Sequence, residues 1–245
     1  MGGWDLVQRV DVAFMLELVP QELVGLRTVV IDVLRATSTI VAALSAGAPY
    51  VVPVETAAAA RELAEQFADV GGCYLGGERH RVRLSGFDFG NSPLEYLELP
   101  AAKPIVFTTT NGTRALKRAL GSEEILIASL GNGAAVAEAL LAADGEVLLV
   151  CSGTRGQIAA EDVLGAGLIV EEMQNRAAIE MTDAARIALA SWQQAKDALT
   201  DFLLQTSSGQ GLSRLGFQQD VIHAAAVNHS DVVPCFSAGR IQCDR

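Results

Sequence analysis

The sequence predicts an α/β protein with a three-layer α/β/α fold and a parallel or mixed sheet. Whether this fold divides into two lobes is left open. Apolar runs alternate with helical patterns along the chain. Residues 147–150 form a continuous apolar run, which is typical of a strand covered on both faces. No linker rich in proline, serine or charge interrupts this order, so we expect one compact α/β domain over residues 1–245.

In the first half, apolar patterns predict strands over residues 10–18, 29–33, 50–54, 73–79 and 104–108. Helical periodicity follows the second strand to residue 44, returns over the alanine-rich residues 55–67 and resumes after residue 113 to about residue 120. Residues 84–93 are polar and glycine-rich without a clear period, and loops of this kind are often functional. A short helix is expected over residues 93–97.

In the second half, strands are expected over residues 124–128, 145–151 and 232–236. Helices are expected over residues 134–142, 159–178 and 182–204, with Thr182 or Asp183 as the cap of the last. A Ser/Gly loop over residues 206–211 precedes a helical stretch over 213–227 that Gly216 interrupts. A loose tail is expected after residue 236.

The charge composition excludes some classes of binding partner. The 18 Lys and Arg against 29 Asp and Glu give a net charge of −11, which argues against nonspecific nucleic-acid binding and against docking on an anionic membrane. The charge is compatible with a local basic site for a small anionic substrate, and such a site would recruit a divalent cation.

The sequence also lacks the patterns of targeting segments, membrane spans and zinc sites. Residues 1–11 lack the basic start and apolar run of a signal peptide, and no apolar stretch has the length of a membrane span. The four cysteines and three histidines form no zinc motif. We therefore expect a reduced cytoplasmic protein, with a homo-oligomer left open.

Three strand ends share one set of features: each apolar strand is followed by hydroxyl groups and an arginine near the start of a helix. The first contains Asp32, Arg35, Thr37 and Ser38; the second contains Asn111, Gly112 and Arg114; the third contains Thr154 and Arg155. Backbone N–H groups, hydroxyls and guanidinium groups bind tetrahedral oxyanions. If the strands are parallel, these ends lie at one edge of the sheet and surround a small anion. Ordinary cap and turn chemistry is the alternative explanation.

Carboxylate side chains are the second group of candidate site residues. Asp32 lies at a strand end, Glu78 follows two glycines, and Glu161 and Asp162 lie at a helix start. Two or three of these groups, if they converge, would suit Mg²⁺, which prefers oxygen ligands and shares its coordination with phosphate. Placement near a helix N-terminus explains Glu161 and Asp162 equally well.

Other phosphate machinery is missing. The sequence contains no GxxxxGK[ST] loop, no complete dinucleotide fingerprint and no GxSxG elbow. The segment from Cys151 to Arg155 is too short for a cysteine-phosphatase loop, so we expect Cys151 to have a packing role.

Five segments together resemble the 2-phosphosulfolactate phosphatase family. They are Val30-Ile-Asp-Val-Leu-Arg-Ala-Thr-Ser-Thr-Ile40, Gly76-Gly-Glu-Arg79, Gly86-Phe-Asp-Phe-Gly-Asn-Ser-Pro93, Thr108-Thr-Thr-Asn-Gly-Thr-Arg-Ala-Leu116, and Cys151-Ser-Gly-Thr-Arg-Gly156 with Glu161-Asp162. A weaker match extends to Val233-Pro234. The family's C-terminal pattern has a histidine before a glycine; here that region is Thr206-Ser-Ser-Gly-Gln-Gly-Leu212, without the histidine.

The resemblance implies an α/β phosphatase-like domain that hydrolyses 2-phosphosulfolactate, or a similar small anionic phosphomonoester, with Mg²⁺ in coenzyme M biosynthesis. The expected catalytic residues are Asp32, Glu78 and Asp162, and the expected metal ligands are Asp32, Glu78, Glu161 and Asp162. The expected substrate-binding residues are Arg35, Thr37, Ser38, Arg79, Asn111, Gly112, Arg114, Thr154 and Arg155. Whether Asp32 attacks phosphorus or a water molecule does is open. The altered C-terminal segment leaves a second hypothesis, a non-catalytic anion-binding or regulatory module with the same pocket.

Overall fold

The computed structural model describes residues 8–243, and its strands form one eleven-stranded sheet in the order β5-β4-β6-β3-β11-β10-β7-β2-β8-β1-β9. Residues 1–7 and 244–245 lie outside the described residues. They are the two ends of the predicted 1–245 domain, and residues 1–7 are most of the segment 1–11 in which we expected no signal peptide. The strands are β1 (Gln8–Ala13), β2 (Leu26–Ile31), β3 (Val51–Pro53), β4 (Tyr74–Arg79), β5 (Val82–Arg83), β6 (Ile105–Thr108), β7 (Glu124–Ala128), β8 (Glu146–Cys151), β9 (Ile179–Met181), β10 (Pro234–Ser237) and β11 (Arg240–Cys243).

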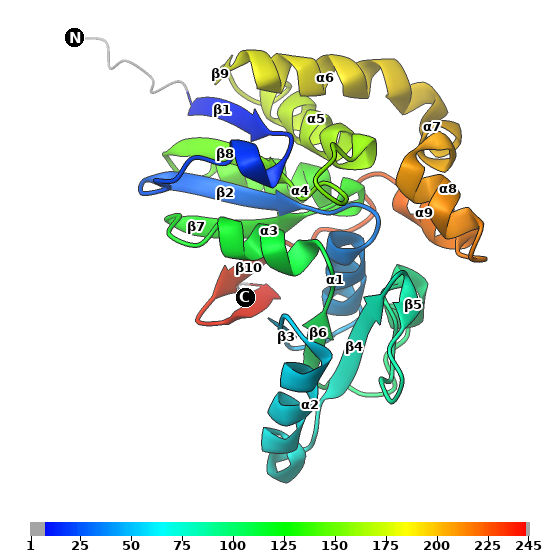
Figure 1. Ribbon diagram of the computed structural model, residues 1–245. Helices are drawn as coiled ribbons and strands as arrows, with labels where there is room; N and C mark the ends of the chain where they lie inside the picture. Colours follow the sequence, from blue (N-terminus) through cyan, green and yellow to red (C-terminus); the bar gives the residue numbers. More distant parts are fainter. Residues whose placement is uncertain (1–7, 244–245) are drawn as a thin grey trace.

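Helices cover both faces of this sheet, which confirms the predicted three-layer α/β class (Figure 1). The α-helices are α1 (Ala36–Ser45), α2 (Ala57–Gln66), α3 (Gly112–Arg118), α4 (Gly133–Leu141), α5 (Ala160–Gln174), α6 (Asp183–Ala195), α7 (Leu199–Gln205), α8 (Ser207–Ser213) and α9 (Gln218–Ala224). Short 3-10 helices are η1 (Leu16–Leu18), η2 (Ala68–Val70), η3 (Pro93–Tyr96), η4 (Leu130–Asn132) and η5 (Lys196–Ala198).

The sheet consists of two parallel groups that run in opposite directions. Strands β9, β1, β8, β2 and β7 are mutually parallel, and so are β3, β6 and β4. The antiparallel hairpin β10–β11 joins the groups through the pairs Cys235–Leu126 and Ile241–Val51. An odd number of reversals therefore separates β2 from β6. Their carboxyl ends approach each other from opposite sides beside α1 (Figure 1).

This geometry corrects one expectation. We expected the strand ends before Asp32, Asn111 and Thr154 to lie at one edge of a parallel sheet. The ends of β2 and β8 do so because these strands are parallel neighbours. The end of β6 belongs to the opposed group and faces them across the space between the two groups.

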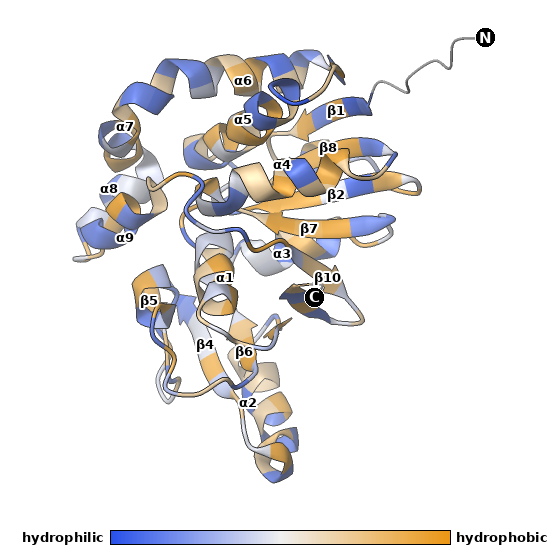
Figure 2. Ribbon diagram, turned by 180° about the vertical axis from the view of Figure 1, so that it is seen from behind, coloured by the Kyte–Doolittle hydropathy of each residue, from blue (hydrophilic) through white to orange (hydrophobic). Residues whose placement is uncertain are grey.

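Strand β2 separates two apolar cores. Val29 and Ile31 pack in a cluster with α4, α5 and α6, whereas Val30 packs in a cluster with α1 and α3. Successive strand residues point to opposite faces, so the continuous apolar run serves both layers. Strands β2, β7 and β8 are accordingly hydrophobic along most of their length (Figure 2).

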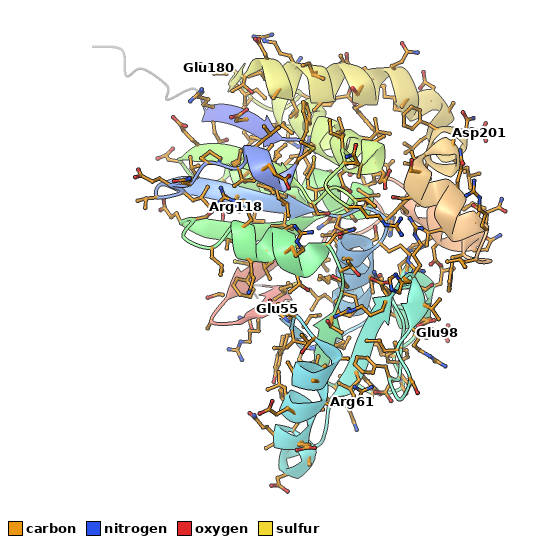
Figure 3. The ribbon with its side chains drawn as sticks, viewed as in Figure 1. Glu55, Arg61, Glu98, Arg118, Glu180 and Asp201 are labelled. Atoms are coloured by element: carbon orange, nitrogen blue, oxygen red, sulfur yellow. The ribbon has the colours of Figure 1, made fainter. Side chains whose placement is uncertain are left out.

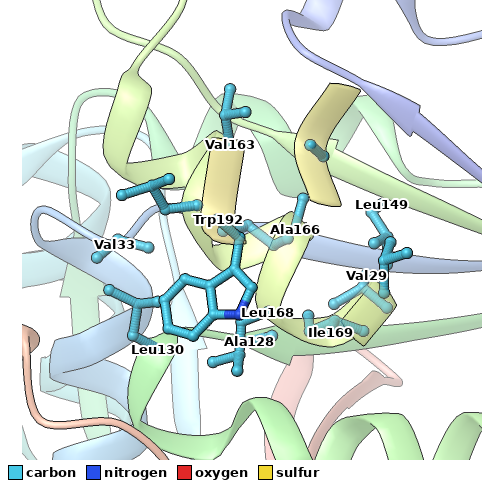
Figure 4. Close-up of a cluster of buried hydrophobic side chains, with 14 of the residues drawn as sticks. Val29, Val33, Ala128, Leu130, Leu149, Val163, Ala166, Leu168, Ile169 and Trp192 are labelled. Atoms are coloured by element: carbon cyan, nitrogen blue, oxygen red, sulfur yellow. The ribbon is translucent and has the colours of Figure 1, made fainter. Parts of the chain in front are cut away.

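Trp192 of α6 closes the larger core. Its ring lies among aliphatic side chains of the sheet and of α5, including Leu168 and Ile169 (Figure 4). Its indole N–H donates to Glu171 Oε2 over 2.7 Å, which satisfies the polar atom of a 4% exposed side chain. Burial of such large side chains contributes roughly 1.5–3 kcal/mol each and fixes α6 on α5.

Several predicted elements differ at their ends. The strand expected over residues 10–18 ends at Ala13 and is followed by η1, and the helix expected over 182–204 is divided by η5. The expected loop 206–211 is wrong because residues 207–211 belong to α8. The expected helix 213–227 is wrong in extent because α8 ends at Ser213 and α9 covers only Gln218–Ala224. The expected loose tail is wrong for residues 240–243, which form β11. Thr182 caps α6 as predicted, accepting from Ala185 N over 3.2 Å.

Many charged side chains lie on the outside of the molecule. Labelled examples in Figure 3 include Arg61, Glu98, Glu180 and Asp201, which point away from the sheet. Among residues 8–243, the structure contains no helix with the length and apolar character to cross a membrane.

Candidate functional site

A pocket of about 110 Å³ opens where the carboxyl ends of the two strand groups meet. Its walls come from the loops after β2, β6 and β8, from the β4–β5 hairpin, from the loop before η3 and from α8. The lining residues are Asp32, Leu34, Arg35, Glu78, His80, Arg81, Asn91, Thr109, Thr110, Asn111, Thr154, Arg155, Ser208 and Leu212.

Asp32 is a buried carboxyl group at the end of β2. Burial raises its pKa from 3.8 to about 6, and the charges of Glu161 and Glu78 add to this rise. Hydrogen bonds from Ala36 N and Ser152 oppose the rise. A carboxyl group with such a pKa exchanges protons near neutral pH, which is typical of acids and bases at functional sites.

Glu161 and Asp162 lie in the first turn of α5, and both are 2% exposed. Asp162 Oδ1 accepts from Val33 N over 2.8 Å, and its Oδ2 accepts from Gly153 N over 3.0 Å. Asp162 thus fixes the loops after β2 and β8 to each other. Burial, followed by the charges of Asp32 and Glu161, raises the pKa of Asp162 well above its usual value.

The side chain of Glu161 differs from that of Asp162 because it takes part in none of the side-chain hydrogen bonds found within residues 8–243. Its carboxylate lies close enough to Asp32, Asp162 and Cys151 to raise the pKa of each. Burial is the largest cause of the raised pKa of Cys151, which is fully buried, in accord with the packing role we expected.

Glu78 links the two sides of the pocket. Its Oε1 accepts from Thr110 Oγ1 over 2.9 Å, and its Oε2 accepts from Arg81 N over 2.5 Å. Both oxygens therefore have protein partners, and the side chain is held in one orientation at 6% exposure.

Arg35 is held firmly although it lines the pocket. Its Nη1 donates to Asp220 Oδ2 over 2.6 Å, and its Nη2 donates to the carbonyl of Arg81 over 3.1 Å. Its guanidinium carbon lies 4.6 Å from the ring centroid of Phe217. Asp220 also accepts from Ser92 Oγ over 2.6 Å. Arg35 thereby fixes α9 and the β4–β5 hairpin around the pocket.

The remaining sequence-predicted residues divide into two sets. Those that line the pocket are Asn111, Thr154 and Arg155. Those outside the lining are Thr37, Ser38, Arg79, Gly112 and Arg114.

Each residue outside the lining has an identifiable place. Thr37 Oγ1 accepts from Asp32 N, and Ser38 Oγ donates to Val33 O, so both shape the turn into α1. Arg79 donates to the carbonyls of Glu78 and Glu55 and to Thr108 Oγ1. Arg114 is exposed on α3.

Gly112 lies directly behind Asp32. A Cβ at this position would lie 2.8 Å from Ala36 Cβ and 3.3 Å from Asp32 Oδ2. The absence of a side chain lets α3 approach the carboxyl group closely.

Sequence reasoning missed part of the pocket. The omitted lining residues with polar side chains are His80, Arg81, Asn91, Thr109, Thr110 and Ser208. Asn91 lies inside the glycine-rich loop that the sequence had marked as functional, so a signal existed for it. Ser208 occupies the position at which the resemblance led us to expect a histidine, and α8 brings it to the pocket.

The metal prediction has a specific structural outcome. Among the described residues, no group of three or more His, Cys, Asp or Glu side chains is arranged to hold a metal ion. Asp32 and Glu161 are nevertheless two buried carboxyl groups close enough for the charge of Glu161 to raise the pKa of Asp32, although Glu161 lies outside the pocket lining. Mg²⁺ sites commonly use one or two carboxylates and complete the coordination with water and substrate phosphate, so this donor set suits the ion.

Comparison with known proteins gives one consistent result. Residues 14–239 match the family model described as 2-phosphosulpholactate phosphatase. A Symbiobacterium thermophilum protein named "Probable 2-phosphosulfolactate phosphatase" is 41% identical over 90% of this chain and 95% of its own length. Proteins with the same name from Pseudothermotoga lettingae and Clostridium perfringens (strain SM101 / Type A) are 40% and 36% identical, over 94% and 96% of this chain and 97% and 96% of their own lengths.

Proposed function

Because the chain belongs to the 2-phosphosulfolactate phosphatase family, we propose that it hydrolyses 2-phosphosulfolactate, or a similar small anionic phosphomonoester, in a Mg²⁺-dependent reaction. The family is named for a phosphoric monoester hydrolase activity. The products would be the corresponding alcohol, sulfolactate, and inorganic phosphate.

One observation supports this proposal best. Asp32, with a pKa raised to about 6, lies in the same small pocket as the guanidinium groups of Arg81 and Arg155. A phosphomonoester needs positive charge and hydrogen-bond donors around its oxygens, and a group near its phosphorus that exchanges a proton or attacks.

The reaction balances with the groups present. An incoming oxygen forms a bond to phosphorus while the bond from phosphorus to the ester oxygen breaks, and the departing alkoxide takes up one proton. Asp32 is suited either to accept the proton of an attacking water or to attack phosphorus itself. Asp162 holds the loop that carries Asp32, and Glu78 orients Thr110 and the Arg81 backbone beside it.

Mg²⁺ would be held by Asp32 and Glu161, where it would neutralise charge on the phosphoryl oxygens. The charge of Glu161 raises the pKa of Asp32, and the charges of both residues raise the pKa of Asp162. A bound cation would offset this repulsion between buried carboxylates, which supports the assignment. Glu78 and Asp162 are weaker candidates because their oxygens already accept hydrogen bonds.

The direct test is phosphate release from racemic 2-phosphosulfolactate, with Mg²⁺ and with EDTA, for wild type and Asp32→Asn. We expect metal-dependent release that the variant loses. Binding without release, in folded protein supplied with both enantiomers and Mg²⁺, would favour the non-catalytic module.

The path of attack is tested by the stereochemistry at phosphorus. A phosphorothioate analogue of the ester, made chiral with two oxygen isotopes and hydrolysed in water enriched in the third, gives inversion at phosphorus if water attacks directly. Attack by Asp32 followed by hydrolysis at phosphorus takes two displacements and gives retention.

A further inference from the structure

The pocket has two chemically different walls. One wall contains Asp32, with Gly112 behind it. The other wall contains α8, whose Ser208 and Leu212 lie four residues apart and both face the pocket. Glu78 connects the two walls: one of its carboxylate oxygens accepts a hydrogen bond from the Thr110 hydroxyl, and the other accepts one from Arg81 N.

Arg81 is directed at the α8 wall. A Cβ at Gly211 of α8 would lie 2.7 Å from Arg81 Cζ, so the guanidinium rests against this glycine. Within residues 8–243 the guanidinium donates no hydrogen bond and joins no ion pair, whereas Arg35 beside it is fully engaged. A guanidinium has five N–H donors in a planar fork that matches carboxylate, sulfonate or phosphate oxygens.

The backbone of Arg81 is nevertheless fixed. His80 and Arg81 form the two-residue turn between β4 and β5, with φ of 56° and 68°. Arg81 N donates to Glu78, and Arg81 O accepts from Arg35. The pocket therefore holds the base of this side chain and leaves its charged end for another partner.

Asn91 provides an independent observation. The residue lines the pocket at 7% exposure, and its Oδ1 is buried without a hydrogen-bond partner in the described structure. The backbone around it is fixed, since Asn91 O accepts from Thr39 Oγ1 and the adjacent Ser92 donates to Asp220. This oxygen is an acceptor, so it needs an N–H or O–H partner such as a bound water, whereas the NH₂ group of the same amide is the part of Asn91 that can donate to an anion.

We propose that Arg81 and Asn91 form a second anion subsite, which binds the non-reacting carboxylate or sulfonate of the phosphoester against α8. This assignment rests on the proposed function and specifies its substrate class. The substrate would carry a second anionic group a few carbons from the phosphate. Leu34 and Leu212 would face the carbon chain, and the phosphoryl group would meet Asp32 on the opposite wall.

The test uses two small probes and does not depend on turnover. Sulfoacetate carries a carboxylate and a sulfonate but no phosphate; inorganic phosphate represents the reacting group. Each is titrated calorimetrically into the full chain with Mg²⁺, alone and with the other probe at saturation. We expect both to bind together, with each affinity changed less than threefold by the other probe.

Three variants locate the subsite. Arg81→Met is expected to weaken sulfoacetate at least tenfold and phosphate less than threefold, because it removes charge-assisted hydrogen bonds from one wall only. Gly211→Ala keeps a helix-compatible residue and displaces the Arg81 guanidinium, so it should weaken sulfoacetate without unfolding the protein. Arg83→Met is the matched control, since exposed Arg83 lies outside the pocket lining and donates to Asp88 O.

Competition between the probes, no sulfoacetate binding by wild type, or an equal loss of both probes in Arg81→Met would overturn the subsite. A wild-type protein that binds both probes together but never releases phosphate from any phosphoester would refute the proposed function and leave the subsite standing.

Discussion

Arg35 and Asp220, which are 185 residues apart in sequence, form a buried ion pair with a separation of 2.6 Å between Nη1 and Oδ2. Each side chain is 3% exposed. The pair joins the start of α1, beside Asp32, to α9. It makes Arg35 a structural member of the pocket as well as a lining residue.

Removal of one partner of this pair should destabilise the protein strongly. We expect Asp220→Ala to lower the free energy of unfolding by about 3–5 kcal/mol, because Arg35 keeps a buried charge without a counterion. Urea denaturation measures the change. The exposed pair Lys117–Glu55, also at 2.6 Å, is the control, and Lys117→Met should cost less than about 1 kcal/mol. Similar small losses in both variants would contradict this role of the buried pair.

The raised pKa of Asp32 predicts a pH-dependent stability difference between wild type and Asp32→Asn. Between pH 3.8 and about 6 the folded wild type binds more protons at this site than the unfolded chain, so its stability falls as pH rises. Relative to wild type, the variant should gain on the order of 3 kcal/mol across this window and little more above it. The effect of Asp32 on the pKa of Asp162 acts in the same direction. Denaturation at several pH values checks this, and a difference independent of pH would refute it.

Mg²⁺ binding should depend on Glu161 and on pH. We expect Glu161→Gln to weaken Mg²⁺ at least tenfold in calorimetric titrations, while Glu138→Gln, on the exposed face of α4, leaves it unchanged. Affinity in wild type should rise from pH 5 to pH 7, because Asp32 must release its proton to bind the ion. Equal affinity in Glu161→Gln and wild type would place the ion elsewhere.

Two arginines with the same sequence context should behave differently. Arg155 lines the pocket, whereas Arg114 is exposed on α3 outside it. Steady-state kinetics should show KM raised at least tenfold by Arg155→Ala and changed less than twofold by Arg114→Ala. If Arg114→Ala raised KM as much, α3 would have to turn toward the substrate during the reaction.

The sequence predicted the strand-to-helix turn at Asp32 well, because an apolar strand and an apolar helix face flank it. It could not predict that the end of β6 faces this turn from an opposed group of strands. That arrangement depends on the pairing of β10 with β7 and of β11 with β3, which is long-range and limited to one registered residue pair on each side.

Arg81 and α8 were missed for local reasons. His80 and Arg81 form a two-residue hairpin turn in which both residues have positive φ. Such turns usually contain asparagine or glycine, and this sequence has neither at these positions. Residues Ser207–Ser213 contain two glycines and three serines, which are poor helix formers. Packing overrides this preference, because Leu212 is 1% exposed and the Thr206 side chain caps the helix at Gly209 N.

The hairpin β10–β11 also bears on how the protein is made. Every pocket residue, and Asp220, precedes residue 230, but the strands that connect the two parallel groups are residues 234–243. A ribosome therefore completes all the chemical groups of the pocket before it completes the sheet that sets them opposite each other. A nascent chain that ends near residue 230 consequently has the site's residues without the connection that aligns its two walls.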